Sequence, residues 1–382
     1  MKKNIKSILS RNITNARGWC TNRKIVVIES DDWGSIRMRD QASFDKLLQS
    51  GIRVDRSKYN CLDSLEKKED LELLFDVLGN HKDQHGNTAK FTTNMVMNNP
   101  DFEKIKADDY QQYHSRTFLD SYKYYYQEDL KSFWFEGIDQ QLVQPQFHAR
   151  EHLNVNLWMR DLQYKQSDTQ LAFKHHFFGL TTKTSSPYQI NYLAAYRAES
   201  EEELKSINRI LIEGLAEFEN VFGFKSKSFI ACNYVWPKEL EKTLLDNGVK
   251  TIQTQRGRTK PQINLDGKPK IKYHYTGQKN KYNQVYTVRN VLFEPFENEA
   301  LDWVNKALND IQNAFFWKKP AIISSHRINY VSQMSVIHRD DNLKNLNRLL
   351  QQIVEKWPTV EFMSSDELGN LIKSKKNEIS HT

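Results

Sequence analysis

The sequence predicts a single α/β barrel built around parallel strands. Short apolar runs rich in β-branched and aromatic residues alternate with helix-like stretches, which is typical of βα units. The length of 382 residues suits one barrel with insertions, and the chain contains no internal repeat. A hydrophobic fraction of 38% with 27% charged residues is typical of a soluble globular protein.

The predicted elements alternate from residue 24 to residue 374. Strands are expected at 24–30, 89–97, 144–148, 227–231, 249–254, 320–325 and 360–364. Helices are expected at 43–50, 66–79, 152–165, 200–222, 237–247, 297–315, 341–356 and 365–374. The helix at 200–222 has the clearest signals, with acids in its first turn and Gly223 at its end. We expect residues 1–23 to form an N-terminal extension and residues 375–382 to form a flexible tail.

Two stretches read as insertions into the barrel. Residues 108–140 are rich in Tyr, Phe and Trp, and we expect most of these rings to pack in a core rather than to form a sugar-stacking platform. Residues 255–292 alternate polar and apolar around "YTGQKNKYN", as a long hairpin would.

The net charge of +7 comes from one segment of the chain. Nine basic residues and a single acid, Asp266, lie between Gln255 and Arg289, and the remainder is nearly neutral. Such a segment could contact an anionic glycan, a lipid-linked phosphate or a membrane surface. A solvated hairpin is the favoured interpretation, and no nucleic-acid partner is expected.

The sequence predicts a cytoplasmic protein. No apolar run approaches the roughly 18–20 residues that span a bilayer, and the basic N-terminus lacks the apolar core of a secretory signal. Cys20, Cys61 and Cys232 share no CxxC spacing, so they predict neither a disulfide framework nor a cysteine zinc site. Cys232 is interpreted as a small buried apolar residue.

The stretch "KIVVIESDDWGS" (24–35) carries two adjacent carboxylates, Asp31 and Asp32, out of an apolar run. Each carboxylate favours the neutral form of the other, a conflict that a bound cation would remove. An exposed acidic turn or a helix N-cap would explain the pair equally well when it is considered alone.

A second stretch, "PQFHAREHLNV", contains His148 and His152 at positions i and i+4. On a helix the two rings would share one face and could bind one metal ion. His81 and His85 have the same spacing, but they lie in a polar loop with no strand before them. We therefore reject that second pair.

Three of these residues leave the ends of predicted strands. Asp31 follows "KIVVIES", His148 follows "QPQF" and His326 follows "PAIISS". In a parallel barrel the carboxyl ends of the strands lie on one face, which holds the chemistry. We therefore expect the three side chains to converge.

These motifs resemble those of the NodB-like polysaccharide deacetylases, carbohydrate esterase family 4. "SDDWG" is similar to the family's Asp-Asp motif, "HAREH" to His-(Ser/Thr)-x-x-His, and "IISSHR" to the strand that ends in a catalytic His. The resemblance covers roughly residues 24–370. It implies a distorted (β/α)7 barrel of the glycoside hydrolase/deacetylase type, a divalent metal such as Zn²⁺, and a carbohydrate substrate.

The resemblance also implies a role for each motif residue. Asp32, His148 and His152 would bind the metal, Asp31 would be the general base, and His326 the general acid. A backbone N–H near Asn233 and Tyr234 would bind the oxyanion.

This chain departs from the family pattern at three places. Ala149 stands where the second motif has Ser or Thr, and Trp33 stands where the first motif has Gly. The third-motif region, "SFIACNYVWPKEL", lacks the Arg that orients the base in the family. Arg150 and Arg327 are the candidate substitutes, and with Trp33 they join Asn233 and Tyr234 as candidate substrate or oxyanion residues.

The predicted activity is the removal of an acetyl group, N-acetyl rather than O-acetyl, from a glycan or an intracellular glycan precursor. One alternative is a sugar deformylase or other amidohydrolase on the same barrel. Another is a catalytically degenerate glycan-binding or assembly protein. Ala149 and the missing Arg favour this last alternative, whereas the five intact motif residues oppose it.

Overall fold

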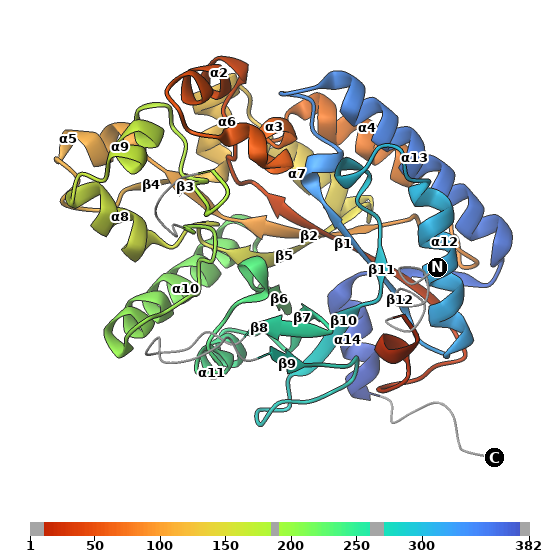
Figure 1. Cartoon of the computed structure of the whole chain (residues 1–382). Helices are drawn as coiled ribbons and strands as arrows, with labels where there is room; N and C mark the ends of the chain where they lie inside the picture. Colours follow the sequence, from red (N-terminus) through yellow and green to blue (C-terminus); the bar gives the residue numbers. More distant parts are fainter. Residues whose placement is uncertain (1–10, 185–190, 260–270, 375–382) are drawn as a thin grey trace, which may run out of the picture.

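A computed structural model describes residues 11–184, 191–259 and 271–374. Its centre is a sheet of parallel strands curled into a barrel (Figure 1). The strands are β1 (Lys24–Trp33), β2 (Phe91–Val96), β5 (Val143–Ala149), β6 (Ser228–Ile230), β7 (Thr251–Gln255), β10 (Val285–Arg289), β11 (Val291–Leu292), β12 (Ala321–His326) and β13 (Val360–Met363). Their order is β10-β7-β6-β5-β2-β1-β12-β11, and β13 pairs with the first residues of β1.

An interrupted strand closes the barrel. Only Asn290 separates β10 from β11, yet β10 pairs with β7 whereas β11 pairs with β12. The backbone N–H of Asn290 donates to the carbonyl of Ile322 (3.1 Å), and the Asn290 side chain accepts from the Ile322 N–H (2.8 Å). With β10 and β11 counted as one position and β13 left off the path, the barrel has seven positions in the described ranges.

The seven predicted strands are all present. Every predicted helix also has its counterpart among the observed α-helices. These are α2 (Gln41–Gln49), α3 (Lys58–Leu62), α4 (Lys68–Gly79), α5 (Phe102–Ala107), α6 (Phe118–Tyr126), α7 (Lys131–Asp139), α8 (Val155–Gln163), α9 (Ser167–Lys174), α10 (Glu201–Phe222), α11 (Leu240–Asp246), α12 (Trp303–Phe316), α13 (Val336–Lys356) and α14 (Ser365–Ser374). The sequence missed the short helices α3, α5, α6, α7 and α9, together with β10 and β11.

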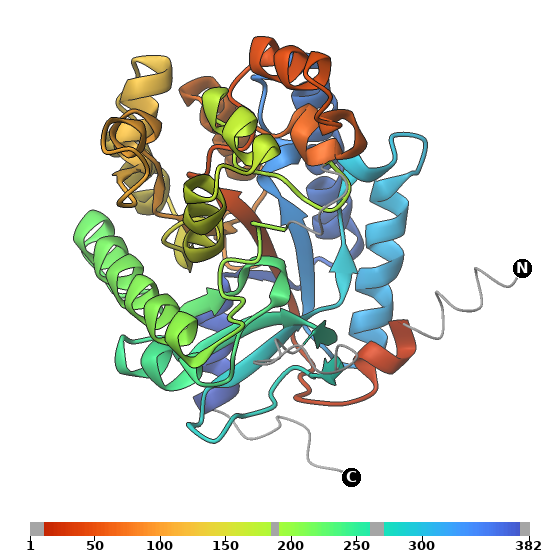
Figure 2. The same cartoon turned by 60° about the vertical axis from the view of Figure 1, so that its left-hand side comes forward.

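Helices cover the outside of the barrel, with α10 and α12 on opposite sides of the central strands in Figure 2. The largest apolar core lies between these helices and the strands. Every residue of β1 after Lys24 is buried, because helices cover one face of a parallel strand and the barrel interior covers the other. Within the described ranges, no helix combines the length and apolar character that crossing a bilayer requires.

Helix α14 closes the amino end of the barrel. Its Leu368 and Ile372 belong to one apolar cluster with Ile25 and Val27 of β1, whose remaining buried members are Trp19, Val285 and Ile322. Gly369 permits the close approach, because a Cβ at this position would lie 1.9 Å from Oγ1 of Thr251. Because apolar packing fills the amino end of the barrel, a polar site is expected at the carboxyl end of the strands.

The aromatic stretch 108–140 is largely part of the barrel wall. Helix α7 leads directly into β5, and Phe118, Tyr122 and Trp134 are fully buried. The expectation that most of these rings pack in a core is confirmed. Two short strands, β3 (Asn98–Pro100) and β4 (Ser115–Thr117), form an antiparallel pair beside this helix layer.

The insertion predicted at 255–292 is shorter than expected. A hairpin is present as β8 (Gly257–Thr259) and β9 (Ile271–Tyr273), but β10 and β11 belong to the barrel. Arg258 and Arg289 are buried, so the basic segment is not uniformly a solvated surface. Exposed Lys279 and Lys281 precede β10, at the amino end of the barrel. Lys260, Lys268, Lys270 and the predicted tail lie outside the described residues.

Candidate functional site

A cavity of about 480 Å³ opens at the carboxyl end of the barrel. Its lining includes all five predicted catalytic and metal-binding residues, namely Asp31, Asp32, His148, His152 and His326. The other lining residues are Arg37, Ser57, Tyr59, Thr181, Thr182, Lys183, Asn191, Leu193, Ala231, Asn233 and Tyr234. The expected convergence of the strand-end residues is therefore present.

A β-bulge brings the two adjacent carboxylates into one site. Ser30 pairs with Thr93 and Trp33 pairs with Met95, so Asp31 and Asp32 together oppose a single residue of β2. Asp32 has a left-handed backbone with φ of 75°. Successive side chains of a regular strand point to opposite faces, and the bulge cancels that alternation.

A second bulge presents the first histidine. Phe147 pairs with Met95 and Ala149 pairs with Val96, which leaves His148 as the extra residue of β5. His152 lies in the loop before α8. The prediction that both rings share a helical face is therefore wrong. A strand end and the loop that follows it bring the rings together, with centroids 5.2 Å apart.

Three donor atoms of this cluster are arranged as a cation site requires. Oδ1 of Asp32 lies 3.4 Å from Nε2 of His148 and 3.4 Å from Nε2 of His152. Nδ1 of His148 lies 2.9 Å from the carbonyl oxygen of Ile230. A proton on Nδ1 satisfies that carbonyl and leaves the Nε2 lone pair for the cavity, which is how metal-binding histidines are oriented.

Cys232 adds a sulfur donor that the sequence interpretation missed. Its Sγ lies 3.7 Å from Nε2 of His148, and the ligand atoms of Cys232, His148 and His152 all lie within 4.8 Å of one another. The cysteine is buried as expected, but it faces polar atoms. It directly follows "KSFIA", so the strand-end rule that selected Asp31 and His148 also selects it.

Charges within the cluster shift the pKa values of its members. Burial disfavours the charge on Asp32, but His152 and His148 hold the pKa of this carboxyl well below its usual value. Burial also opposes a proton on His148, yet Cys232, Asp32 and Asp31 raise the pKa of that imidazole. These acidic groups favour a positive charge between them. A divalent metal can take the place of the proton, so the residues fit such an ion.

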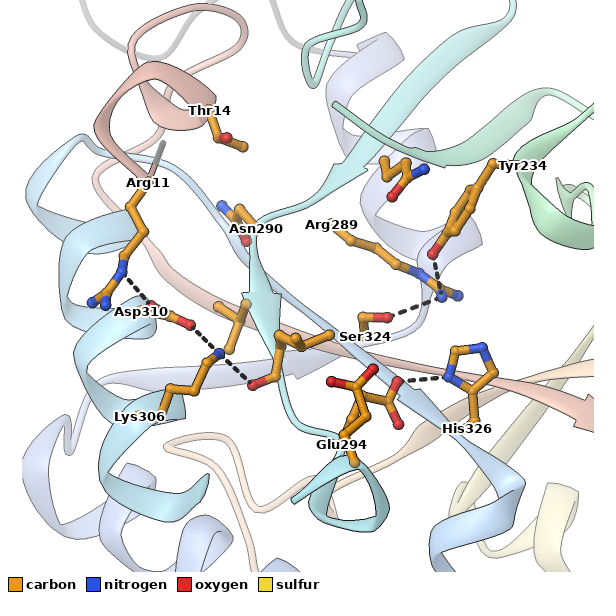
Figure 3. A pocket seen from close by; sticks show the side chains of 14 residues that line it. Arg11, Thr14, Tyr234, Arg289, Asn290, Glu294, Lys306, Asp310, Ser324 and His326 are labelled. Carbon is orange, nitrogen blue, oxygen red and sulfur yellow. Dashed lines mark hydrogen bonds and ion pairs between the residues drawn. The ribbon is translucent and has the colours of Figure 1, made fainter. Parts of the chain in front are cut away.

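Asp31 is held by an arginine that the sequence interpretation did not choose. Nη2 and Nη1 of Arg289 donate to the two Asp31 oxygens over 2.6 and 2.8 Å, and Nε donates to Glu29 over 2.7 Å. The guanidinium also reaches Tyr234 and Ser324 (Figure 3). Burial would raise the pKa of Asp31, but Arg289 and the nearby histidines lower it to about 2.

The prediction that Arg150 or Arg327 replaces the arginine of the third motif is therefore wrong. Arg150 pairs with Glu151 and Glu213, and Arg327 pairs with Asp63 and Glu66. Neither residue lines the cavity. A local signal for Arg289 exists in "VYTVR", a short run of β-branched and aromatic residues that a charged residue follows, as Asp31 follows "KIVVIES", but the hairpin interpretation concealed it.

His326 is Asp31's neighbour across the β1–β12 pairing, with 3.6 Å between His326 Nε2 and Asp31 Oδ2. Its Nδ1 lies 2.6 Å from Oε1 of Glu294 (Figure 3), and Asn329 donates to the other Glu294 oxygen over 2.9 Å. Burial disfavours a charged imidazole, but Glu294, Asp31 and Asp32 raise the pKa of His326 to about 9. Glu294 was not predicted.

The remaining candidates have different outcomes. The N–H of Tyr234 donates to the Ala231 carbonyl, so it is not available to an oxyanion, whereas its hydroxyl accepts from Arg289. Asn233 lines the cavity in a left-handed conformation, and among the described residues its N–H has no hydrogen-bond partner. Trp33 is fully buried and its Nε1–H donates to Ser30, so its proposed contact with substrate is wrong.

A second cavity of about 440 Å³ adjoins the first, and Tyr234 and His326 line both. Arg289 and Glu294 line this second cavity (Figure 3). On its far wall, Asp310 pairs with Arg11 and with Lys306. The His326 ring thus has open space on two sides.

The sequence matches no protein-family model and no curated protein. Solved structures similar to this chain include a protein described as a glycoside hydrolase/deacetylase from Parabacteroides distasonis, at 9% identity and a TM-score of 0.48, covering 94% of this chain and 73% of the other. An allantoinase has 10% identity, 94% coverage of both chains and a TM-score of 0.44. A protein described as a polysaccharide deacetylase from Pseudomonas aeruginosa has 9% identity, 93% coverage of both and a TM-score of 0.44.

Proposed function

We propose that this protein is a metal-dependent hydrolase that removes an acetyl group, N-acetyl rather than O-acetyl, from a carbohydrate. One observation carries the proposal: Asp31, Asp32, His148, His152 and His326 meet around a single cavity at the carboxyl end of the barrel. A base, an acid and a set of metal donors are the groups that acyl hydrolysis requires.

Asp32, His148 and His152 would hold the divalent ion. A bound Zn²⁺ lowers the pKa of water to about 7 and polarises a carbonyl group. The carbonyl of Ile230 keeps Nε2 of His148 turned toward the cavity, and Asp32 lies between the two rings. These contacts hold the donors in place before an ion arrives.

Asp31 would accept a proton from the attacking water. Its low pKa keeps it ionised at neutral pH, and the two-point contact with Arg289 fixes its orientation. His326 would donate a proton to the departing nitrogen, since Glu294 favours the charged imidazole. The N–H of Asn233, which has no partner in the described part of the chain, is the candidate donor to the oxyanion.

The cavity lining would attract a negatively charged sugar once Arg289 and the bound ion balance Asp31 and Asp32. Arg37 and Lys183 line it, whereas the cations of the loop before β10 lie at the other end of the barrel. Lys183→Gln should raise KM for an anionic oligosaccharide by about threefold, less at high salt, because an exposed charge contributes about 0.2–1 kcal/mol. Lys279→Gln is the matched control, and an equal change in KM for both variants would show that the charge of Lys183 in the cavity does not attract the sugar.

Metal content tests the site directly. Purified wild-type protein should hold about one Zn²⁺ or similar ion per chain, whereas Asp32→Ala and His148→Ala should lose it and keep their circular dichroism spectra. His81→Ala, in the rejected histidine pair, is the control and should retain the ion. A wild-type protein that binds no divalent ion would contradict the proposed hydrolase.

Release of acetate from acetylated oligosaccharides tests the reaction. We expect release by the metal-loaded protein and none by Asp31→Asn, because the amide cannot accept the proton. Formate release from formylated sugars without acetate release would indicate the alternative deformylase. Metal binding and glycan binding without any release would indicate the degenerate glycan-binding protein.

A further inference from the structure

We propose that Cys232 binds the metal ion as a thiolate, together with His148, His152 and Asp32. The ion would then be held by nitrogen, oxygen and sulfur donors. This inference rests on the proposed function only in requiring an ion between the two histidines. It assigns a role to a residue that the hydrolytic steps above do not use.

Three of the distances between these donors agree with coordination of one ion. Usual zinc–ligand distances and tetrahedral angles give about 3.6 Å between a sulfur and a nitrogen ligand, and about 3.4 Å between a nitrogen and an oxygen ligand. Here Cys232 Sγ lies 3.7 Å from His148 Nε2, and Asp32 Oδ1 lies 3.4 Å from Nε2 of each histidine. His148 therefore sits between an oxygen donor and a sulfur donor.

The backbone around Cys232 aims the thiol at the histidines. Cys232 begins the 3₁₀ turn Cys232–Tyr234 immediately after β6, and its carbonyl accepts from the Val235 N–H over 3.1 Å. The side chain is fully buried. The other two cysteines are half-buried and lie elsewhere, with Cys20 beside Lys319 and Cys61 beside the carbonyl of Asp55.

A sulfur ligand changes which ions the site prefers. Thiolates select zinc, copper and other softer ions, whereas carboxylate and water ligands suit Mg²⁺, Ca²⁺ and Mn²⁺. Coordination would release the thiol proton to solvent as the sulfur–metal bond forms. Four protein donors fill a four-coordinate site, and a catalytic zinc ion can expand to five-coordination, which leaves one position for substrate or water.

Cobalt substitution tests the sulfur ligand without reference to activity. Titration of the metal-free full-length protein with Co²⁺ should produce visible ligand-field bands together with an intense near-ultraviolet band from sulfur-to-cobalt charge transfer. Cys232→Ser should retain the visible bands and lose the near-ultraviolet band. The matched control Cys61→Ser should keep both. In competition experiments, Cys232→Ser should bind Zn²⁺ about 100-fold more weakly, with a smaller change for Mn²⁺.

The outcomes separate this inference from the proposed function. Visible bands without a charge-transfer band in wild type would overturn the thiolate ligand and leave the Asp32, His148 and His152 site intact. The absence of any cobalt spectrum would contradict both the thiolate ligand and the metal site of the proposed function. Because Cys232→Ser differs by one atom and its visible bands report an intact site, a misfolded variant cannot be mistaken for a lost ligand.

Discussion

Replacing Arg289 by Met is expected to lower the free energy of unfolding by about 3–5 kcal/mol and kcat by about 100-fold or more. Arg289 is buried, and its guanidinium neutralises both Glu29 and Asp31. Its loss leaves two buried carboxylates that repel each other, so the pKa of Asp31 should rise. Since ionised Asp31 is the active form, the acidic limb of the pH–rate profile should move to higher pH. Urea unfolding and pH–rate profiles measure the two effects.

Arg339→Met is the matched control for this variant. Arg339 is also buried and pairs with buried Asp70 (3.0 Å), but it does not line the cavity. Its guanidinium also pairs with the exposed Glu69 and the half-buried Asp340. The Arg339→Met variant should lower the free energy of unfolding by a similar amount without changing kcat. Adding Glu29→Gln to Arg289→Met should recover part of the stability but not the activity, because Asp31 still lacks its partner. Full activity in Arg289→Met would refute the assigned role of Arg289.

Replacing His326 by Ala is expected to lower kcat by about 10²–10⁴-fold, the usual contribution of a positioned general acid. The wild-type rate should fall as pH rises through the pKa of His326, which is about 9 before an ion binds, because only protonated His326 can donate to the leaving group. Glu294 raises this pKa, so Glu294→Gln should move the alkaline limb to lower pH. The pH dependence of kcat/KM measures both expectations.

Glu297→Gln provides the charge-matched control for Glu294. Glu297 is exposed, and it lines the second cavity rather than contacting His326. Removal of the Glu297 charge should leave the position of the alkaline limb of the pH–rate profile unchanged. If the limb keeps its position in Glu294→Gln, or moves equally in both variants, then the His326–Glu294 pair does not set the protonation of the general acid.

Much of the fold could be predicted because the relevant signals are local. Strands buried on both faces appear as short continuous apolar runs, and all seven predicted runs are strands. Asp31, His148 and His326 were found because charged residues at strand ends meet in a parallel barrel. Strands β10 and β11 were missed because the basic run between 255 and 289 indicated a surface hairpin, and β11 has only two residues.

The site was predicted only in part, since its supporting contacts join distant segments. Arg289 and Asp31 are 258 positions apart, and neither stretch contains a signal that predicts contact with the other. Glu294 likewise meets His326 across the β11–β12 connection. Cys232 passed the same strand-end rule as His148, but a lone cysteine is more often a packing residue.

By itself, the sequence determined the order of strands and helices and which polar residues leave the carboxyl ends of strands. The tertiary structure alone decided how those side chains point. Strand pairing inserts one extra residue at Asp31–Asp32 and one at His148, and each bulge turns a donor into the cavity. A bulge is a mismatch between two paired strands, so neither strand's sequence encodes it alone. The choice of Arg289 over Arg150 and Arg327 has the same origin, because barrel closure determines which guanidinium lies beside Asp31.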